Sequence, residues 1–432
     1  MNLRALATVA LIVSLYVLVN VLSHPFLVSA YQTPLTPDQI RAAYDVTPLL
    51  QSGYTGKGVT VAIVLAQLTI NATFYSDLKA FNSKYGLPDA VISVAQPYEG
   101  SPQTAEEITA DTEFVHAMAP DAKILLVPDF SYVIDHNAAD IATTSWTSGA
   151  DRNTILSDNT EYAKSVGMKI TLIAASGDGG SNNTFYWPNG VQPPDDSMAQ
   201  YSQYLTVVGG TALTLQAGTY SETGWENSGG GPSNLFTQPT WQKGRGVPEN
   251  GFRNIPDIAL NAACETPYAD YYEGKPSGFC GTSGAAPIFA GIMADIMQAA
   301  GERLGFLNPT LYSLSSSDPS VYHDVTSGCS LLQAGSSKQT GYCAHAGWNF
   351  VTGFGSIDAT KLATHLAPGT HIVPATTTTT SREPPTETTA SISPFTQHYM
   401  VLGQIETVIV IAFIVVLVIV LVMMRRRLHS EY

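Results

Sequence analysis

Three short stretches of this 432-residue chain hold side chains that can act together as nucleophile, base and hydrogen-bond donor. The first is Gly-Thr-Ser-Gly-Ala-Ala-Pro at 281–287, where Ser283 stands directly before a long apolar run. Small neighbours let a substrate backbone approach the hydroxyl, and a helix N-terminus stabilises developing negative charge. Serine is also a common N-cap residue, so this motif alone predicts either a nucleophile or a helix cap.

The second stretch contains Glu107 and Asp111, which are spaced four residues apart. On a helix this spacing puts both carboxyl groups on one face. Two carboxylates so close repel each other, which raises the pKa of one of them and makes a pair suited to acid–base work. The alternative is a solvated acidic helix face, and the neighbouring Glu106 and Glu113 favour that interpretation.

The third stretch is Ser-Gly-Asp-Gly-Gly at 176–180, which follows the apolar run 169–175. Asp178 would therefore lie in a turn at the carboxyl end of a buried strand. Aspartate is also common in such turns for purely conformational reasons. His116 is the nearest competing base, but it lies five residues after Asp111, on a different helix face, and we interpret it as structural.

The elements that must position these residues alternate along the chain. Buried strands are predicted at 58–65, 123–127, 169–175 and 204–208, the last ending at Gly209-Gly210, and helices at 74–85, 105–119, 162–166 and 285–300. Uninterrupted apolar strands that alternate with helices predict an α/β fold, with a parallel sheet and helices on both faces. Sites in such sheets lie beyond the carboxyl ends of the strands, where all three stretches fall.

In this order and at these spacings, the three stretches resemble the sedolisin, or serine-carboxyl peptidase, family. The resemblance covers about residues 33–367, and further matching stretches lie at 36–44, 53–58, 228–233, 236–242 and 346–356. It implies a subtilisin-like fold and an acid peptidase acting on proteins or peptides. The roles implied are Ser283 as nucleophile, Glu107 as its base, Asp111 as the group that tunes Glu107, and a protonated Asp178 as oxyanion donor.

The same resemblance implies two further sites. Ser145 and Trp146 resemble the strand that pairs with substrate backbone, although Thr147 stands where the family often has glycine. One calcium ion is implied near the C-terminal part of the body. Its ligands would be the Asp324 carboxylate, the carbonyls of Val325, His345 and Gly347, and the side chain of Asn349. The family has aspartate at this last position, so one ligand charge is missing and calcium affinity should be lower.

Composition narrows the class of protein. Charged residues are only 13% of the chain, and the net charge of −15 argues against a nucleic-acid partner, which needs a basic surface. Four cysteines allow three pairings in an exported protein, and sequence proximity favours Cys264–Cys280 and Cys329–Cys343.

The two ends of the chain predict export and anchoring. Residues 1–30 have the pattern of a signal peptide, 31–367 form the peptidase domain, and 368–398 form a Thr/Pro-rich stalk. An apolar transmembrane helix is expected at 405–424, and its basic tail, 425–432, is expected on the cytoplasmic side. We therefore expect a single-pass protein of the cell membrane with an extracellular catalytic domain.

Other interpretations stay open at this point. The family usually carries a long N-terminal prodomain, whereas here the catalytic start closely follows the signal segment, so a prodomain or inhibitor supplied as a separate chain is one route to control. A catalytically inactive surface-binding module on the same fold is the alternative function. A conventional subtilisin with His116 as base is a third interpretation, and the absence of a His-Gly-Thr-His motif argues against it.

Overall fold

The computed structural model describes residues 33–64, 70–95, 102–146, 152–183, 202–216, 218–334 and 337–374, which all lie in a compact unit beginning at Thr33. The predicted signal peptide, transmembrane helix and tail lie outside these residues, as does most of the predicted stalk. No helix within the described ranges is both long enough and apolar enough to span a membrane.

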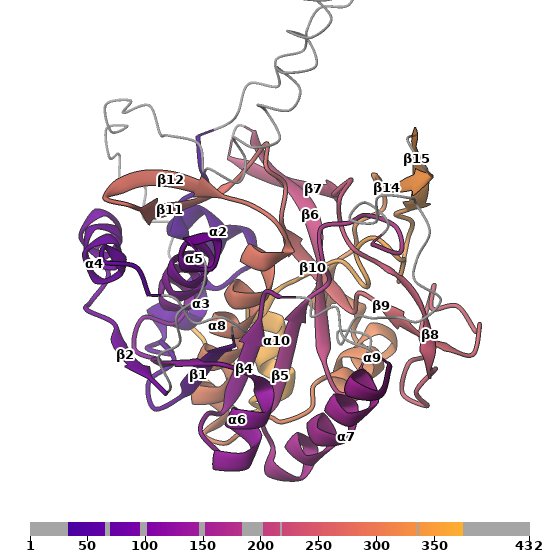
Figure 1. Ribbon diagram of the computed structural model, residues 1–432, viewed down its shortest axis with the longest axis horizontal. Helices are drawn as coiled ribbons and strands as arrows, with labels where there is room; N and C mark the ends of the chain where they lie inside the picture. The colour runs from indigo at the N-terminus through magenta and orange to yellow at the C-terminus, as the bar shows by residue number, and fades with distance from the viewer. Residues whose placement is uncertain are drawn as a thin grey trace, which may run out of the picture. The chain divides into compact units, whose positions relative to one another are not determined.

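An eight-stranded sheet forms the centre of this unit (Figure 1). Neighbouring strands of this sheet pair in parallel, except that β7 pairs antiparallel with β6. In spatial order the strands are β2 (Val91–Val94), β3 (Lys123–Val127), β1 (Thr60–Val64), β4 (Ile141–Thr144), β5 (Thr171–Ala175), β6 (Thr206–Gln216) and β10 (Ile258–Asn261), with β7 (Thr219–Gly224) beside β6.

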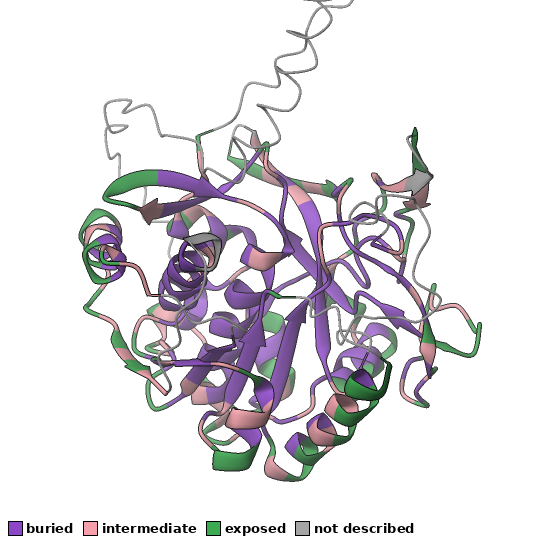
Figure 2. Cartoon of the chain, viewed as in Figure 1, coloured by how far each residue is buried: buried purple, intermediate pink, exposed green. Residues whose placement is uncertain are grey.

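Both faces of the sheet are covered, and alternate residues of one strand enter different cores. Val61 and Ile63 of β1 pack in the larger core, to which α5 and α8 contribute, whereas Ala62 and Val64 pack in the core built by α6 and α7. The central strands are therefore buried throughout, as Figure 2 shows, which explains why their sequences are uninterrupted apolar runs. The predicted α/β class and helix coverage are confirmed.

The helices are α2 (Pro37–Ala43), α3 (Thr47–Gln51), α4 (Phe74–Tyr85), α5 (Pro102–Met118), α6 (Phe130–His136), α7 (Arg152–Met168), α8 (Thr282–Ala300), α9 (Asn308–Ser317) and α10 (Ala359–Leu366), with a 3₁₀ turn at Pro319–Val321. Four two-stranded ribbons complete the unit: β8 (Gly231–Thr237) with β9 (Phe252–Ile255), β11 (Tyr268–Tyr272) with β12 (Lys275–Phe279), β13 (Tyr322–His323) with β16 (Ser356–Ile357), and β14 (Cys329–Ala334) with β15 (Ser337–Cys343).

Some predicted boundaries were wrong. The strand expected to end at Gly209-Gly210 continues to Gln216, because beyond β5 and β10 it gains β7 as a third partner. Gly210 is needed inside this strand, since a Cβ there would lie 2.7 Å from the ring of Trp225. Helix α7 is also far longer than the predicted segment 162–166.

The two disulfides join Cys264 to Cys280 and Cys329 to Cys343. These are the pairs that sequence proximity favoured. The first pair ends directly before Gly281, and thus anchors the segment that leads into α8.

Candidate active site

Helix α5 carries Glu107 and Asp111 into the interior of the protein. From Ala105 to Met118 every residue is buried except Glu107, which is partly exposed. Glu106 and Glu113 are buried as well, so the alternative of a solvated acidic helix face is wrong. Burial of Asp111 with Glu107 one turn away gives the carboxyl pair that the spacing predicted.

Asp111 is joined to the end of strand β4 through Ser145. The Ser145 hydroxyl lies 3.0 Å and 2.9 Å from the two carboxyl oxygens of Asp111, to which it can donate. The same hydroxyl lies 3.1 Å from the carbonyl oxygen of Ser283, a second acceptor. Ser145 therefore connects the carboxyl pair on α5 to the start of α8.

Ser283 lies in the first turn of α8, and it is not the helix cap. The helix begins at Thr282, its N-cap is Gly281, and no side chain caps it. Between Thr282 and Met297, Ser283 is the one residue that is not buried, and its hydroxyl donates to the Ser145 carbonyl at 3.4 Å. The capping alternative is therefore wrong, and the hydroxyl is accessible at a helix N-terminus.

Pro287 explains why the Ser283 carbonyl can accept from Ser145. In an α-helix the N–H of residue 287 would donate to the carbonyl of residue 283. Proline has no N–H, so this carbonyl stays available for the Ser145 hydroxyl at 3.1 Å. Pro287 has no role among the sequence-based predictions, although its position four residues after Ser283 is a signal for this free carbonyl.

Asp178 lies after β5 and is held by the residue before Ser283. The Thr282 N–H and hydroxyl both donate to Asp178 Oδ1, each at 2.8 Å. A Cβ at Gly281, where φ is +109°, would lie 2.5 Å from Asp178 Oδ2, so this approach requires glycine. With Oδ1 occupied, Oδ2 is the oxygen that can carry a proton toward the site. Thr282 was missed as a supporting residue.

The glycines around Asp178 are required by close packing rather than by flexibility. A Cβ on Gly177 or Gly179 would lie 2.6 Å or 2.7 Å from an atom of Asn183. The Asn183 side chain accepts from the Gly179 N–H and donates to the Ser176 carbonyl. The turn is thus closed around one asparagine, which fixes the direction of Asp178.

Burial raises the pKa of all three carboxyl groups. It raises the pKa of Glu107 to about 8, with smaller contributions from the charges of Asp178 and Glu106, while the hydroxyls of Ser283 and Ser145 lower it. Burial and then the charge of Glu107 raise the pKa of Asp111 well above its ordinary value. Burial raises the pKa of Asp178 against the hydrogen bonds from Thr282. The three groups therefore hold protons more strongly than free carboxyl groups.

His116 faces away from this chemistry. Its Nε2 lies 2.9 Å from the Pro88 carbonyl oxygen, and burial lowers the pKa of the ring. The structural role expected for His116 fits this geometry, and a conventional histidine base is not supported here.

The predicted substrate residues continue β4 beyond its last paired residue. Ser145 is buried, and its hydroxyl contacts Asp111 and Ser283 inside the protein, whereas Trp146 is 39% exposed. The Trp146 N–H lies 3.3 Å from the Thr144 hydroxyl. An exposed indole beside Ser283 is a suitable surface for a peptide side chain.

The five predicted calcium ligands do converge. Asp324 accepts from the Gly347 N–H at 3.0 Å and 3.1 Å, and the Asn349 amide faces the carbonyls of Val325, His345 and Gly347. The five residues named from the sequence therefore lie close together in the folded chain.

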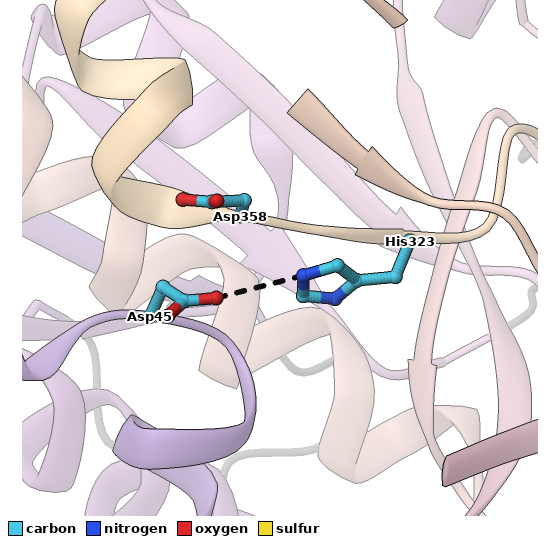
Figure 3. Close-up of side chains that lie close together, drawn as sticks. All are labelled: Asp45, His323 and Asp358. Atoms are coloured by element: carbon cyan, nitrogen blue, oxygen red, sulfur yellow. Dashed lines mark ion pairs between the residues drawn. The ribbon is translucent and has the colours of Figure 1, made fainter. Parts of the chain in front are cut away.

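A second polar cluster lies between α2, β13 and α10 (Figure 3). Asp45, His323 and Asp358 have ligand-type atoms within 4.8 Å of one another. Asp45 pairs with His323 at 3.5 Å, while Asp358 caps α10 and pairs with Lys361 at 2.9 Å. Since each group already has a protein partner, this cluster joins three segments of the fold and shares no residue with the catalytic set.

Residues 86–314 match the sequence pattern of the subtilase family (Peptidase S8). The chain belongs to the subtilase family. The relatives of this chain include sedolisin, so the similarities indicate the sedolisin group within the subtilase family.

Three curated relatives illustrate the similarity. The chain is 31% identical to kumamolisin of Bacillus sp. (strain MN-32) over 376 residues, 79% of this chain and 65% of the relative. It is 34% identical to sedolisin of Pseudomonas sp. (strain 101) over 261 residues, 56% of this chain and 43% of the relative. It is 28% identical to tripeptidyl-peptidase 1 of Rattus norvegicus over 368 residues, 74% of this chain and 62% of the relative. The chain thus spans less than two thirds of each relative's length.

A solved structure gives the same assignment. Pseudomonas sedolisin, a serine-carboxyl proteinase complexed with two molecules of pseudo-iodotyrostatin, matches 77% of this chain and 98% of that chain. The TM-score is 0.66 and the sequence identity 28%. Together these similarities support the sedolisin group within the subtilase family and indicate a serine-type peptidase.

Proposed function

We propose that this protein is an acid-active serine-carboxyl peptidase that hydrolyses peptide bonds of extracellular proteins or peptides. One observation carries the proposal. Glu107 and Ser283 are the partly exposed positions in two otherwise buried helical stretches, α5 and α8 share one core, and Ser145 contacts both the Asp111 carboxyl and the start of α8. A carboxylate and a serine hydroxyl that meet at a helix N-terminus form a nucleophile–base pair.

In the proposed mechanism, the Ser283 hydroxyl oxygen attacks the scissile carbonyl carbon while its proton passes to Glu107. Asp178 donates a hydrogen bond from its carboxyl to the oxyanion that forms, and the N-terminus of α8 adds its positive potential. Glu107 then gives its proton to the leaving amine, and an acyl-enzyme ester remains on Ser283. Water deprotonated by Glu107 hydrolyses this ester, which restores the serine.

The surroundings of the site suggest how substrate is held. We assign Ser145 and Trp146 to the segment that binds substrate backbone in an extended conformation. The proposal has three further parts. Residues 405–424 anchor the protein in the cell membrane, the catalytic domain faces outward, and a separate prodomain or inhibitor controls its activity. Cleavage within chains and release of tripeptides are both compatible with it.

The test is hydrolysis of a mixed peptide library by the purified full chain from about pH 2 to about pH 8, compared with Ser283→Ala. We expect activity only in acid and a loss of about 10³-fold or more in the variant. Circular dichroism would check that both proteins are folded. A folded wild-type chain that is inert at every pH would leave two explanations: the protein needs a prodomain supplied by another chain, or it is the surface-binding alternative.

A further inference from the structure

The Asn349 side chain occupies the centre of the predicted calcium cluster. It is 1% exposed, and its Nδ2 lies 3.5 Å, 3.3 Å and 3.4 Å from the carbonyl oxygens of Val325, His345 and Gly347. Three backbone carbonyls thus converge on one amide nitrogen, and these are three of the oxygens expected to surround a cation.

The orientation of this amide is fixed from its other side. Asn349 Oδ1 accepts from the N–H groups of Val351 and Thr352, each at 3.0 Å, and lies 3.2 Å from the Thr352 hydroxyl. Backbone N–H groups can only donate and backbone carbonyls can only accept. Turning the amide over would place its hydrogens against two N–H groups and its oxygen against three carbonyls.

This arrangement does not fit a calcium ion. Calcium takes about six to eight oxygen ligands at about 2.3–2.6 Å. Here the Asn349 oxygen is committed to donors, and the amide hydrogens point into the space between the carbonyls. Asp324, the remaining ligand expected, already accepts from the Gly347 N–H. The prediction of a calcium ion is therefore not supported by the side-chain chemistry at position 349.

We propose that the Asn349 amide takes the place of the ion, so that this protein closes the cluster with hydrogen bonds and needs no calcium. The amide supplies the partial positive charge that the three carbonyls require. Aspartate at the same position would keep one oxygen on the donors of Val351 and Thr352, and would turn the other toward the carbonyls. The single change Asn349→Asp should therefore create a divalent-cation site.

Thermal unfolding of the full chain tests this inference independently of peptidase activity. At about pH 6, where an exposed aspartate is ionised, the wild-type melting temperature should be the same in excess EDTA and in millimolar CaCl₂. Equilibrium dialysis against radioactive calcium should detect no bound ion. A wild-type melting temperature that rises with CaCl₂ and falls with EDTA would overturn the proposal, whatever the variants do.

Two variants complete the test. Asn349→Asp should melt roughly 5 °C or more lower in EDTA than in CaCl₂, and it should bind one ion. Asn153→Asp adds the same charge at an exposed position of α7 and should show no calcium response. If Asn349→Asp folds but melts identically with and without calcium, the amide is not what excludes the ion, and the inference is wrong.

Discussion

In the proposed mechanism, Ser283 gives its proton to an ionised Glu107, whereas Asp178 donates a hydrogen bond in its neutral form. Two features of the site favour this combination. Glu107 is partly exposed, and the hydroxyls of Ser283 and Ser145 lower its pKa. Asp111, in contrast, is fully buried. Negative charge on Asp178 and Glu106 contributes to the raised pKa of Glu107. In acid Asp178 is neutral, so Glu107 can ionise at lower pH than when Asp178 is charged.

Replacing Glu107 by its neutral isostere should remove the base. We expect Glu107→Gln to lower kcat/KM by about 10²- to 10⁴-fold with little loss of stability. Glu113→Gln is the matched control: it lies on the same helix, is also buried, and accepts from the Tyr271 N–H, but it is not part of the Ser283 site. Equal losses in both variants, measured as kcat/KM on one peptide, would argue against Glu107 as base.

Asp178 should set the alkaline limit of activity. Burial raises its pKa, so it stays neutral in acid and becomes a repelling anion as pH rises through that pKa. Asp178→Asn keeps an oxygen for Thr282 and a donor at every pH. The ratio of kcat/KM at about pH 7 to that at about pH 4 should therefore rise roughly tenfold or more in this variant.

The control for this pH profile is Asp178→Ala, which removes the donor altogether. Its kcat/KM should fall most in acid, where wild-type Asp178 is a donor, and the alkaline limb should be lost, because alanine has no proton to lose. A profile of Asp178→Asn with the wild-type shape would assign the alkaline limit to another group.

At the scale of elements, the first turn of α8 is where the site is assembled. Thr282 binds Asp178, Ser283 presents its hydroxyl, and the Ser283 carbonyl is left for Ser145 by Pro287. The adjacent helix α5 packs against α8 and supplies the carboxyl pair. One helix end therefore contacts three other segments of the fold, and small changes in its hydrogen bonding should alter catalysis.

Pro287→Ala tests this arrangement. The new N–H at residue 287 would donate to the Ser283 carbonyl and compete with the Ser145 hydroxyl. We expect kcat/KM to fall by about tenfold while the melting temperature stays unchanged or rises, because proline inside a helix is unfavourable by up to about 3 kcal/mol. A lower melting temperature with unchanged kcat/KM would mean that Pro287 serves packing alone.

Several carboxyl groups outside the proposed site are buried in the described part of the chain. Besides the catalytic three, burial is the largest cause of a raised pKa at Glu113, Glu222, Asp270 and Asp295. Among the described residues, neither carboxyl oxygen of Asp295 has a hydrogen-bond partner. Ionised carboxylates without partners are costly in the interior, so the folded state favours their neutral forms.

The folded protein should therefore be most stable in acid. Each such group has a higher pKa in the folded than in the unfolded state, so the folded protein binds its proton more strongly. The contribution of the group to the free energy of unfolding is therefore fully present only below its unfolded-state pKa. The free energy of unfolding should fall as pH rises through the window between the two values, which for Glu107 runs from 4.5 to about 8. Each pKa unit corresponds to about 1.4 kcal/mol, so denaturant titrations at several pH values should resolve the trend.

Asp295→Asn isolates one contribution to this trend. Its amide cannot ionise, so the variant should equal or exceed the wild type in acid and be more stable by about 1–3 kcal/mol near pH 7. Asp38→Asn is the exposed control, since the Asp38 side chain is 81% exposed, and it should leave the pH dependence unchanged. A wild-type stability that rises from acid to neutral pH would contradict the prediction.

Local sequence patterns predicted the parallel sheet and the helices that cover it. Apolar runs such as 171–175 have to be buried on both faces, which requires a parallel sheet with helices on each side. The spacing of Glu107 and Asp111 followed from helical geometry alone. These inferences succeed because hydrophobic periodicity and helix pitch are local properties, readable within a few residues.

Only the tertiary structure decided which polar atoms meet. That Ser283 occupies the first turn of α8 rather than its cap depends on contacts with Asp178 and Ser145, more than a hundred residues away in sequence. The orientation of the Asn349 amide depends likewise on Val325, 24 residues away, as well as on nearer neighbours. Hydrogen-bond partners are selected by distance and direction in space, and a linear sequence contains neither until the chain is folded.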